Sequence, residues 1–263
     1  CSHTPSPERA CLPMKIRLCQ IQVDASSPEK NFSRIRQILT SANEDLIVFP
    51  EACTTGFPYR RLTSIKDANQ IFLEEIILQS ANRTGAVLLP LLIEENNVIY
   101  NRLHWITGGK IAARYDKIHL IGILGEDRFL SRGSDIVTVP WKPHIAGLAT
   151  CYDLRFPELF RKLILKGADI LTIPAMWPIE RAAHLHPLAK ARAIENQAYV
   201  LVCNGCGPCG SMDLCGSSIA IDPKGEVIAQ AGSEEEQLTF EIDPAFAAEW
   251  RKDFPALGDI RLI

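Results

Sequence analysis

The 263-residue sequence predicts an α/β protein in which strands and helices alternate along the chain. Short runs rich in Val, Ile and Leu recur, and stretches with apolar residues at helical spacing separate them. A composition of 47% hydrophobic and 22% charged residues is that of a globular protein long enough to bury a sizeable core. We find no linker, repeat or low-complexity tract, so residues 14–263 are expected to form one domain. Residues 1–13 are interpreted as a tail or a non-native remnant.

The first half of the chain alternates predicted strands and helices. Pro28 opens a helix whose apolar residues Phe32, Ile35, Ile38 and Leu39 fall on one face. A second amphipathic helix is expected over residues 67–84. The predicted strands are apolar runs, and the last two form a hairpin about Gly108 and Gly109. These strands cover residues 15–23, 46–49, 86–93, 98–107 and 110–115.

The second half repeats this pattern. Helices are expected over residues 157–166 and 186–197. The Pro-Gly turn in Asp222-Pro223-Lys224-Gly225 predicts a second hairpin, because these residue types adopt the dihedral angles of tight turns. The predicted strands cover residues 136–139, 145–150, 170–173, 198–203, 217–221 and 226–229.

Charge and cysteine usage exclude several classes of function. A net charge of −3 without basic runs argues against a nucleic-acid partner, and no apolar stretch has the length needed to cross a bilayer. The first residues lack the apolar segment of a secretory signal. The nine cysteines lie mostly in apolar segments, which is typical of free thiols in a reducing compartment, so we predict a cytoplasmic protein.

Three side chains with useful chemistry follow directly on predicted strands. Glu51 follows the string LIVFP, Cys151 follows strand 145–150, and Lys117 follows the second hairpin strand. Open α/β folds bind ligands where strands end, so we expect the three to meet. Taken singly, such a cysteine is usually a small core residue and such a lysine is usually solvated. Together they supply a nucleophile, a base and a cation for acyl transfer.

Each side chain has an expected role in that chemistry. Burial at the sheet edge raises the pKa of a carboxylate, so Glu51 could take a proton from a thiol. Cys151 is expected at a turn from strand into helix, where the helix start favours a thiolate. The ammonium group of Lys117 and the backbone N–H of Tyr152 are expected to bind the developing oxyanion.

Three longer strings surround these residues: LIVFPEACTTGFPYR, YDKIHLIGILGEDRFLSRGSD and GLATCYDLRFPELFR. They resemble the signature blocks of the nitrilase, or carbon-nitrogen hydrolase, superfamily. The resemblance continues through ADILTIPAMWP, ARAIENQAYVLVCN and GSSIAIDPKGEVIA, so it covers the chain from Met14 to about Asp243. It implies a four-layer α-β-β-α sandwich, a homodimer and a cysteine hydrolase that needs no metal or cofactor. The residues it marks as catalytic are Glu51, Lys117, Cys151 and a second glutamate, Glu126.

The substrate is expected to be a small linear amide. The strings CYDLRFPE, PAMWP and RAAHLHPLAKARAIENQ resemble the omega-amidase branch, which hydrolyses the side-chain amide of dicarboxylate monoamides such as 2-oxoglutaramate. Phe57 and Trp177 are expected to wall the acyl pocket, and Arg155 or His184 to meet a substrate carboxylate. Each could equally be a packing aromatic or a structural ion pair. Alternative functions are an N-carbamoyl amine hydrolase, a nitrile hydrolase or a non-catalytic binding protein on the same fold.

A cluster of cysteines competes with this hypothesis. Cys203, Cys206, Cys209 and Cys215 have spacings that can mark zinc or iron-sulfur ligation. Against a metal, Cys203 ends an apolar strand and no histidine lies nearby in sequence. The resemblance implies a metal-free loop over the active site. We also consider a reversible disulfide between Cys151 and Cys206 or Cys209. His119 is interpreted as a structural neighbour of Lys117.

Overall fold

The computed structural model describes residues 13–58, 62–141, 143–243 and 245–262. Six strands form the first sheet in the order β14-β1-β2-β3-β4-β5. The central strands β1, β2 and β3 are parallel, whereas β4, β5 and β14 pair in antiparallel fashion with their neighbours. The bounds are β1 Met14–Gln20, β2 Leu46–Val48, β3 Ala86–Glu95, β4 Val98–Thr107, β5 Lys110–Asp116 and β14 Glu236–Ile242.

The second sheet has the same plan. Its strand order is β13-β12-β9-β8-β7-β6, and its centre is the parallel set β7, β8 and β9. Antiparallel strands again complete both edges. The bounds are β6 Thr138–Trp141, β7 His144–Leu148, β8 Ile170–Ala175, β9 Tyr199–Asn204, β12 Ile219–Ile221 and β13 Val227–Gln230.

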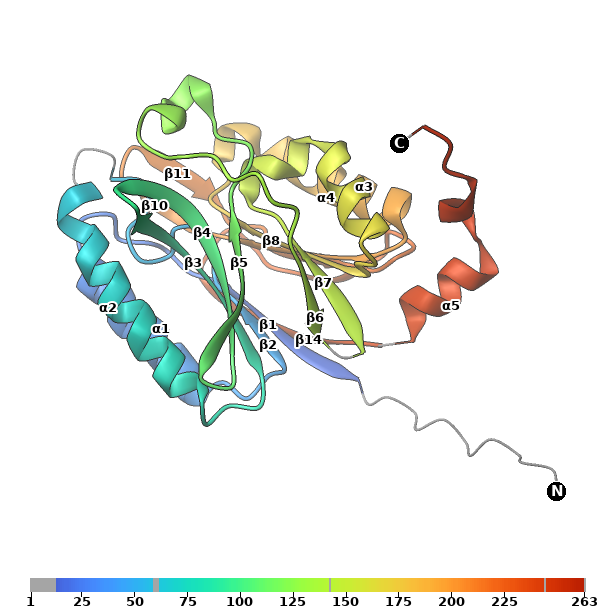
Figure 1. The fold of residues 1–263 in the computed structure, drawn as a ribbon, viewed down its shortest axis with the longest axis horizontal. Coiled ribbons are helices and arrows are strands. Elements are labelled where there is room, and N and C mark those ends of the chain that lie inside the picture. Colours follow the sequence, from blue (N-terminus) through green and yellow to red (C-terminus); the bar gives the residue numbers. More distant parts are fainter. Residues whose placement is uncertain (1–12, 59–61, 142, 244, 263) are drawn as a thin grey trace.

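The two sheets face each other between two layers of helices, as Figure 1 shows. Along β2 and β3, alternate residues serve different cores because successive side chains point to opposite faces of a sheet. Val48 and Leu88 pack in the core shared with the second sheet, whereas Ile47 and Val87 pack in the core under α1 and α2. The helices are α1 Pro28–Ser41, α2 Leu62–Ser80, α3 Pro157–Leu165, α4 Ala182–Asn196 and α5 Phe246–Asp253.

This architecture confirms the α-β-β-α sandwich and most of the predicted elements. The bounds of two helices were wrong: α2 spans Leu62–Ser80 instead of 67–84, and α4 begins at Ala182 instead of at residue 186. The 3₁₀ turn η5 (Ile179–Arg181) continues directly into α4, which tolerates Pro187 in its second turn.

Three elements were not predicted from the sequence. They are α5, β14 and a small separate hairpin of β10 (Cys206–Cys209) and β11 (Met212–Cys215). β14 is an edge strand with mostly exposed residues, although the alternation of Leu238, Phe240 and Ile242 was a signal that could have identified it. The two hairpin strands are only four residues long and show no clear hydrophobic period. The resemblance implied a loop at residues 206–215, and the structure corrects this to a hairpin.

Two further predictions concern membrane spans and the tail at the start of the chain. In the described ranges, no helix combines the length and the apolar character that a membrane span requires. The predicted tail, residues 1–13, lies outside the described residues except for Pro13.

Candidate active site

Glu51, Lys117 and Cys151 lie at the ends of strands from both sheets. Glu51 follows β2, and Lys117 follows β5 directly. Cys151 follows β7 and opens the 3₁₀ turn η4 (Cys151–Arg155). Its φ of 43° lies in the left-handed region, where a residue with a side chain is strained by roughly 1–3 kcal/mol. The sharp turn directs the thiol into a pocket that Glu51 and Lys117 also line.

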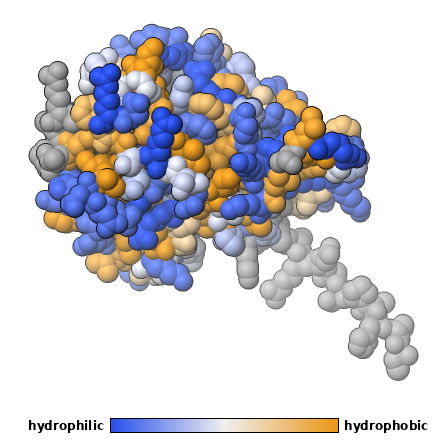
Figure 2. Space-filling model, turned by 45° about the horizontal axis from the view of Figure 1, so that its top comes forward, coloured by the Kyte–Doolittle hydropathy of each residue, from blue (hydrophilic) through white to orange (hydrophobic). Residues whose placement is uncertain are grey.

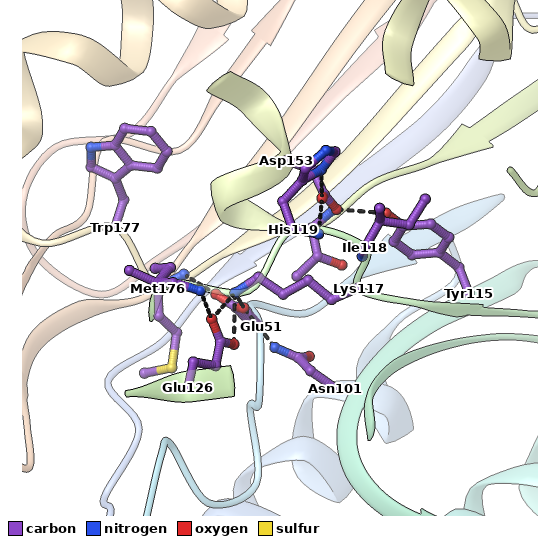
Figure 3. Close-up of polar contacts among 12 residues, drawn as sticks. Glu51, Asn101, Tyr115, Lys117, Ile118, His119, Glu126, Asp153, Met176 and Trp177 are labelled. Atoms are coloured by element: carbon purple, nitrogen blue, oxygen red, sulfur yellow. Dashed lines mark hydrogen bonds and ion pairs between the residues drawn. The ribbon is translucent and has the colours of Figure 1, made fainter. Parts of the chain in front are cut away.

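The ammonium group of Lys117 is held between two carboxylates (Figure 3). Its Nζ lies 2.8 Å from Oε1 of Glu51, and 2.8 and 3.0 Å from the two oxygens of Glu126. All three side chains are only 1% exposed. A buried charge is tolerated when it is paired and hydrogen-bonded, which these contacts provide.

Glu51 is fixed by further hydrogen bonds. Asn101 of β4 donates its Nδ2 to Oε1 at 2.7 Å, and the backbone N–H of Met176 donates to Oε2 at 3.1 Å. The thiol of Cys151 lies close enough to Glu51 for the two groups to shift each other's pKa. The carboxylate therefore interacts with the thiol and the ammonium at the same time, as a general base requires.

Burial dominates the ionisation of these groups. It raises the pKa of Glu51, with a further upward contribution from Glu126 that opposes the attraction of Lys117. Burial raises the pKa of Cys151 well above its usual range, and the Glu51 carboxylate raises it further. Burial alone would lower the pKa of Lys117, but Glu51 and Glu126 outweigh it and raise the pKa well above the usual value. At rest the site therefore holds a neutral thiol and an ammonium ion.

One sequence expectation is wrong in its net effect. The start of a helix was expected to favour the thiolate of Cys151. The structure has only the short turn η4 there, and Cys151 is 4% exposed, so desolvation outweighs any help from that turn. The sulfur would therefore need a base beside it to react as a thiolate.

A pocket of about 520 Å³ opens over this cluster, a volume suited to a small molecule. It contains every site residue that the sequence predicted. These are Glu51, Phe57, Lys117, Glu126, Cys151, Tyr152, Arg155, Trp177 and His184. The centre of the Phe57 ring lies 5.9 Å from Nζ of Lys117, so this aromatic side of the pocket lies beside the charged cluster of Glu51, Lys117 and Glu126.

The outer part of the pocket is cationic and aromatic. The guanidinium of Arg155 lies 4.7 Å from the centre of the Trp177 ring, and both terminal nitrogens lie 3.4 Å from Nδ1 of His184. Among the described residues, Arg155 makes no ion pair with a carboxylate. Arg181 lines the same region, and its carbonyl accepts the indole N–H of Trp177 at 2.7 Å. This part of the pocket suits an anionic group of a ligand.

Hydrophobic residues reach the surface in several patches between hydrophilic ones (Figure 2). Ile123 and Leu124 belong to the 3₁₀ turn η2 (Gly122–Leu124), which borders the pocket, and they are 87% and 44% exposed. The pocket therefore has an apolar border beside its cationic one.

Several residues in or beside the pocket were not predicted from the sequence. Asn101 lies within β4, and no strand end or motif marks it. Arg181 lies beside the predicted His184, and a second cation near the expected carboxylate site could have been inferred from that proximity. Met212 and Cys209 come from the unpredicted β10–β11 hairpin.

The cysteine cluster does not gather at one point. Cys206 faces Cys215 across the β10–β11 pair, while Cys203 on β9 donates its thiol to the carbonyl of Val48. In the part of the chain that the structure describes, no three His, Cys, Asp or Glu residues form a group that could hold a metal. Cys209 does line the pocket with Cys151, and burial raises its pKa to about 11. The proposed disulfide stays a prediction.

Comparison with known proteins agrees with this geometry. The carbon-nitrogen hydrolase family profile matches residues 15–252. The chain is 33% identical to a 2-oxoglutaramate amidase of Bacillus subtilis, over 94% of this chain and 97% of that protein. It is also 33% identical to omega-amidase YafV of Escherichia coli K12, over 94% and 96%. Nit3 of Saccharomyces cerevisiae, described as a member of branch 10 of the nitrilase superfamily, superposes with a TM-score of 0.81 at 26% identity, covering 92% and 94%.

We predict that Lys117→Met lowers the free energy of unfolding at neutral pH by about 3–5 kcal/mol, because it leaves two buried carboxylates without a counter-charge. Acid should reduce this loss, since a proton on one carboxylate relieves the repulsion. Urea denaturation at several pH values measures it. The matched control is Lys66→Met, which breaks the more exposed pair with Glu94 and should change stability little. Equal effects of the two changes would contradict a buried charge cluster.

Proposed function

The chain belongs to the carbon-nitrogen hydrolase family. We propose that it hydrolyses the ω-amide of a small dicarboxylate monoamide such as 2-oxoglutaramate. The reaction releases ammonia and passes through a thioester on Cys151. The chain is thus an amidohydrolase that acts on carbon-nitrogen bonds other than peptide bonds, as its amidase-named relatives indicate. The substrate class rests on two such relatives and on the cationic part of the pocket.

One observation carries the reaction type. A thiol, a carboxylate and an ammonium line one pocket of small-molecule size, and the carboxylate is hydrogen-bonded to the ammonium. These are the nucleophile, the base and the oxyanion-stabilising charge that acyl transfer needs. Glu51 is bonded to Lys117 and lies close enough to Cys151 to raise the pKa of the thiol, so it links the three groups.

In the first half of the reaction, Glu51 takes the thiol proton as the sulfur of Cys151 attacks the amide carbon. The carbonyl oxygen gains the negative charge. Lys117 bonds to one oxygen of Glu51 and to both oxygens of Glu126. We propose that the two Glu126 oxygens share one N–H during the reaction, so that one of the three N–H groups can bind this oxygen. The backbone N–H of Tyr152 is the proposed second donor. The carbon-nitrogen bond then breaks, and Glu51 returns its proton to the leaving nitrogen, so ammonia departs.

In the second half, water attacks the thioester carbon. Glu51 accepts a proton from the water, and Lys117 again stabilises the oxyanion. The carbon-sulfur bond breaks, the carboxylic acid is formed, and Glu51 gives the proton back to the sulfur. Glu126 contacts Lys117 and is proposed to hold the ammonium in place during both halves.

The distal carboxylate of the substrate is proposed to bind Arg155. The Trp177 ring supports one side of the guanidinium, and His184 contacts its nitrogens, so the planar group is oriented before substrate arrives. Phe57 is the proposed wall for the methylene carbons between the two ends of the substrate.

Ammonia release from a panel of amides tests the proposed function. We expect turnover of 2-oxoglutaramate to exceed that of neutral butanamide. Arg155→Met should raise KM for 2-oxoglutaramate about 10- to 100-fold through loss of a charged hydrogen bond, and leave KM for butanamide nearly unchanged.

Arg161→Met is the control for that panel, because Arg161 of α3 bonds only to the carbonyl of Glu195 in the described contacts and lies away from the pocket. An equal loss on both amides would remove Arg155 from substrate recognition. Turnover restricted to N-carbamoyl amines or nitriles would replace the ω-amidase proposal by the alternative hydrolase.

The pH profile tests the role of Glu51. The base must be ionised, so its raised pKa should place the acid limb of kcat/KM above the usual range of a glutamate. Glu126→Gln removes a negative charge that raises this pKa, so the limb should move to lower pH. The control Glu44→Gln neutralises a buried carboxylate paired with Arg17 outside the pocket, and should not move it. A limb that moves to higher pH in Glu126→Gln would contradict the assignment.

The domain limits, the homodimer and the cytoplasmic location remain predictions. The family match over residues 15–252 supports one hydrolase domain over residues 14–263. The homodimer is what the family resemblance implies. Seven described cysteines are free and buried, as a reducing location would require.

A further inference from the structure

Asp153 is a buried carboxylate that lies beside the pocket and does not line it. Its Oδ2 accepts the hydroxyl of Tyr115 at 2.6 Å and the backbone N–H of Thr150 at 2.8 Å. Its Oδ1 accepts the ring Nδ1–H of His119 at 2.7 Å and the backbone N–H of the same residue at 3.1 Å. Figure 3 shows these side chains converging on Asp153. Four hydrogen bonds to one carboxylate make a rigid junction.

On one side, the hydrogen bonds of Asp153 close the turn that carries Cys151. Asp153 follows Cys151 by two residues, and its carboxylate reaches back to the N–H of Thr150, which precedes Cys151. The backbone N–H of Asp153 donates to the carbonyl of Thr150 at 2.9 Å. Cys151 lies inside this closed turn with its strained φ of 43°. A strained conformation persists only where its surroundings hold it, and Asp153 supplies that restraint.

On the other side, the junction holds the lysine segment. Tyr115 and His119 lie two residues before and two residues after Lys117. They belong to the end of β5 and the segment after it, whereas Cys151 follows β7 of the other sheet. The His119 ring also stacks on Phe156 at 3.7 Å between centroids, which fixes its plane. The Asp153 carboxylate is therefore bonded to both sides of Lys117 and to the turn that carries Cys151.

We propose that Asp153 is a positioning residue whose bonds to Tyr115 and His119 fix the Cys151 turn relative to Lys117 across the two sheets. The inference rests on the proposed function in assigning catalysis to these two residues. Reaction rates depend steeply on such geometry, because a displacement of about 1 Å can cost roughly 100-fold. The hydrogen bonds of Asp153 matter in the transition state, where the sulfur and the ammonium must reach one carbonyl group. Asp153 does not line the pocket in which the substrate carboxylate is proposed to bind.

Tyr115→Phe removes one bond of the junction and keeps the buried ring. We expect kcat to fall about tenfold while KM stays within about twofold. The matched control is Tyr199→Phe. The Tyr199 ring is also buried in the shared core, and its hydroxyl donates to the carbonyl of Asp243 at 2.9 Å, away from the pocket. This control should lose similar thermal stability without a loss of kcat.

His119 provides a second, independent variant pair. Because a carboxylate only accepts, the Nδ1 that bonds to Asp153 carries the hydrogen. His119→Asn places an amide N–H at the same distance along the side chain, whereas His119→Leu has no donor. We expect His119→Asn to retain most of kcat and His119→Leu to lose it about tenfold. Equal kcat in the two variants would overturn the role of this bond.

A measurement without an amide substrate separates this inference from the proposed function. The rate at which iodoacetamide alkylates Cys151, followed by peptide mass spectrometry, should be lower in Tyr115→Phe than in Tyr199→Phe. If wild type releases ammonia and both tyrosine variants match it in kcat and alkylation, the positioning role is overturned and the function stands. If wild type releases no ammonia from any amide, the function falls, and the alkylation rates alone decide the inference.

Discussion

The buried ammonium of Lys117 between Glu51 and Glu126 is the interaction on which the site depends. Two carboxylates this deep in an apolar sandwich would repel each other. The shared cation at hydrogen-bond distance offsets that repulsion, and the two glutamates raise the pKa of Lys117 and so keep it charged. The same ammonium is the proposed donor to a developing oxyanion. One contact therefore stabilises the resting site and the charge that forms during the reaction.

The fold brings these groups together from separate layers. The first sheet supplies Glu51 after β2 and Lys117 after β5, and the second supplies Cys151 after β7. Such an arrangement needs an accurate register between the sheets. The apolar core shared by the two sheets sets it coarsely, and the hydrogen bonds of Asp153 to residues flanking Lys117 set it locally. The left-handed φ of Cys151 then aims the thiol at Glu51.

The strands and the positions of Glu51, Lys117 and Cys151 at strand ends follow from local patterns, because an apolar run that ends in a charged or reactive residue is visible in the sequence. The four layers were implied by the family resemblance. Glu126 has no such marker and was expected only from the family resemblance. Asn101 could not be inferred, since its bond to Glu51 joins residues 50 apart. The ionisation of Cys151 was misjudged because burial, which opposes a thiolate, depends on packing that no local pattern reveals.

The most direct test of the account is to trap the acyl-enzyme. The protein is mixed with 2-oxoglutaramate, quenched in acid during turnover and digested for mass spectrometry. We expect the peptide that contains Cys151 to gain a mass equal to that of the substrate less ammonia, together with an equivalent burst of ammonia. Ammonia release with an unmodified Cys151, or an acyl group on another residue, would contradict it.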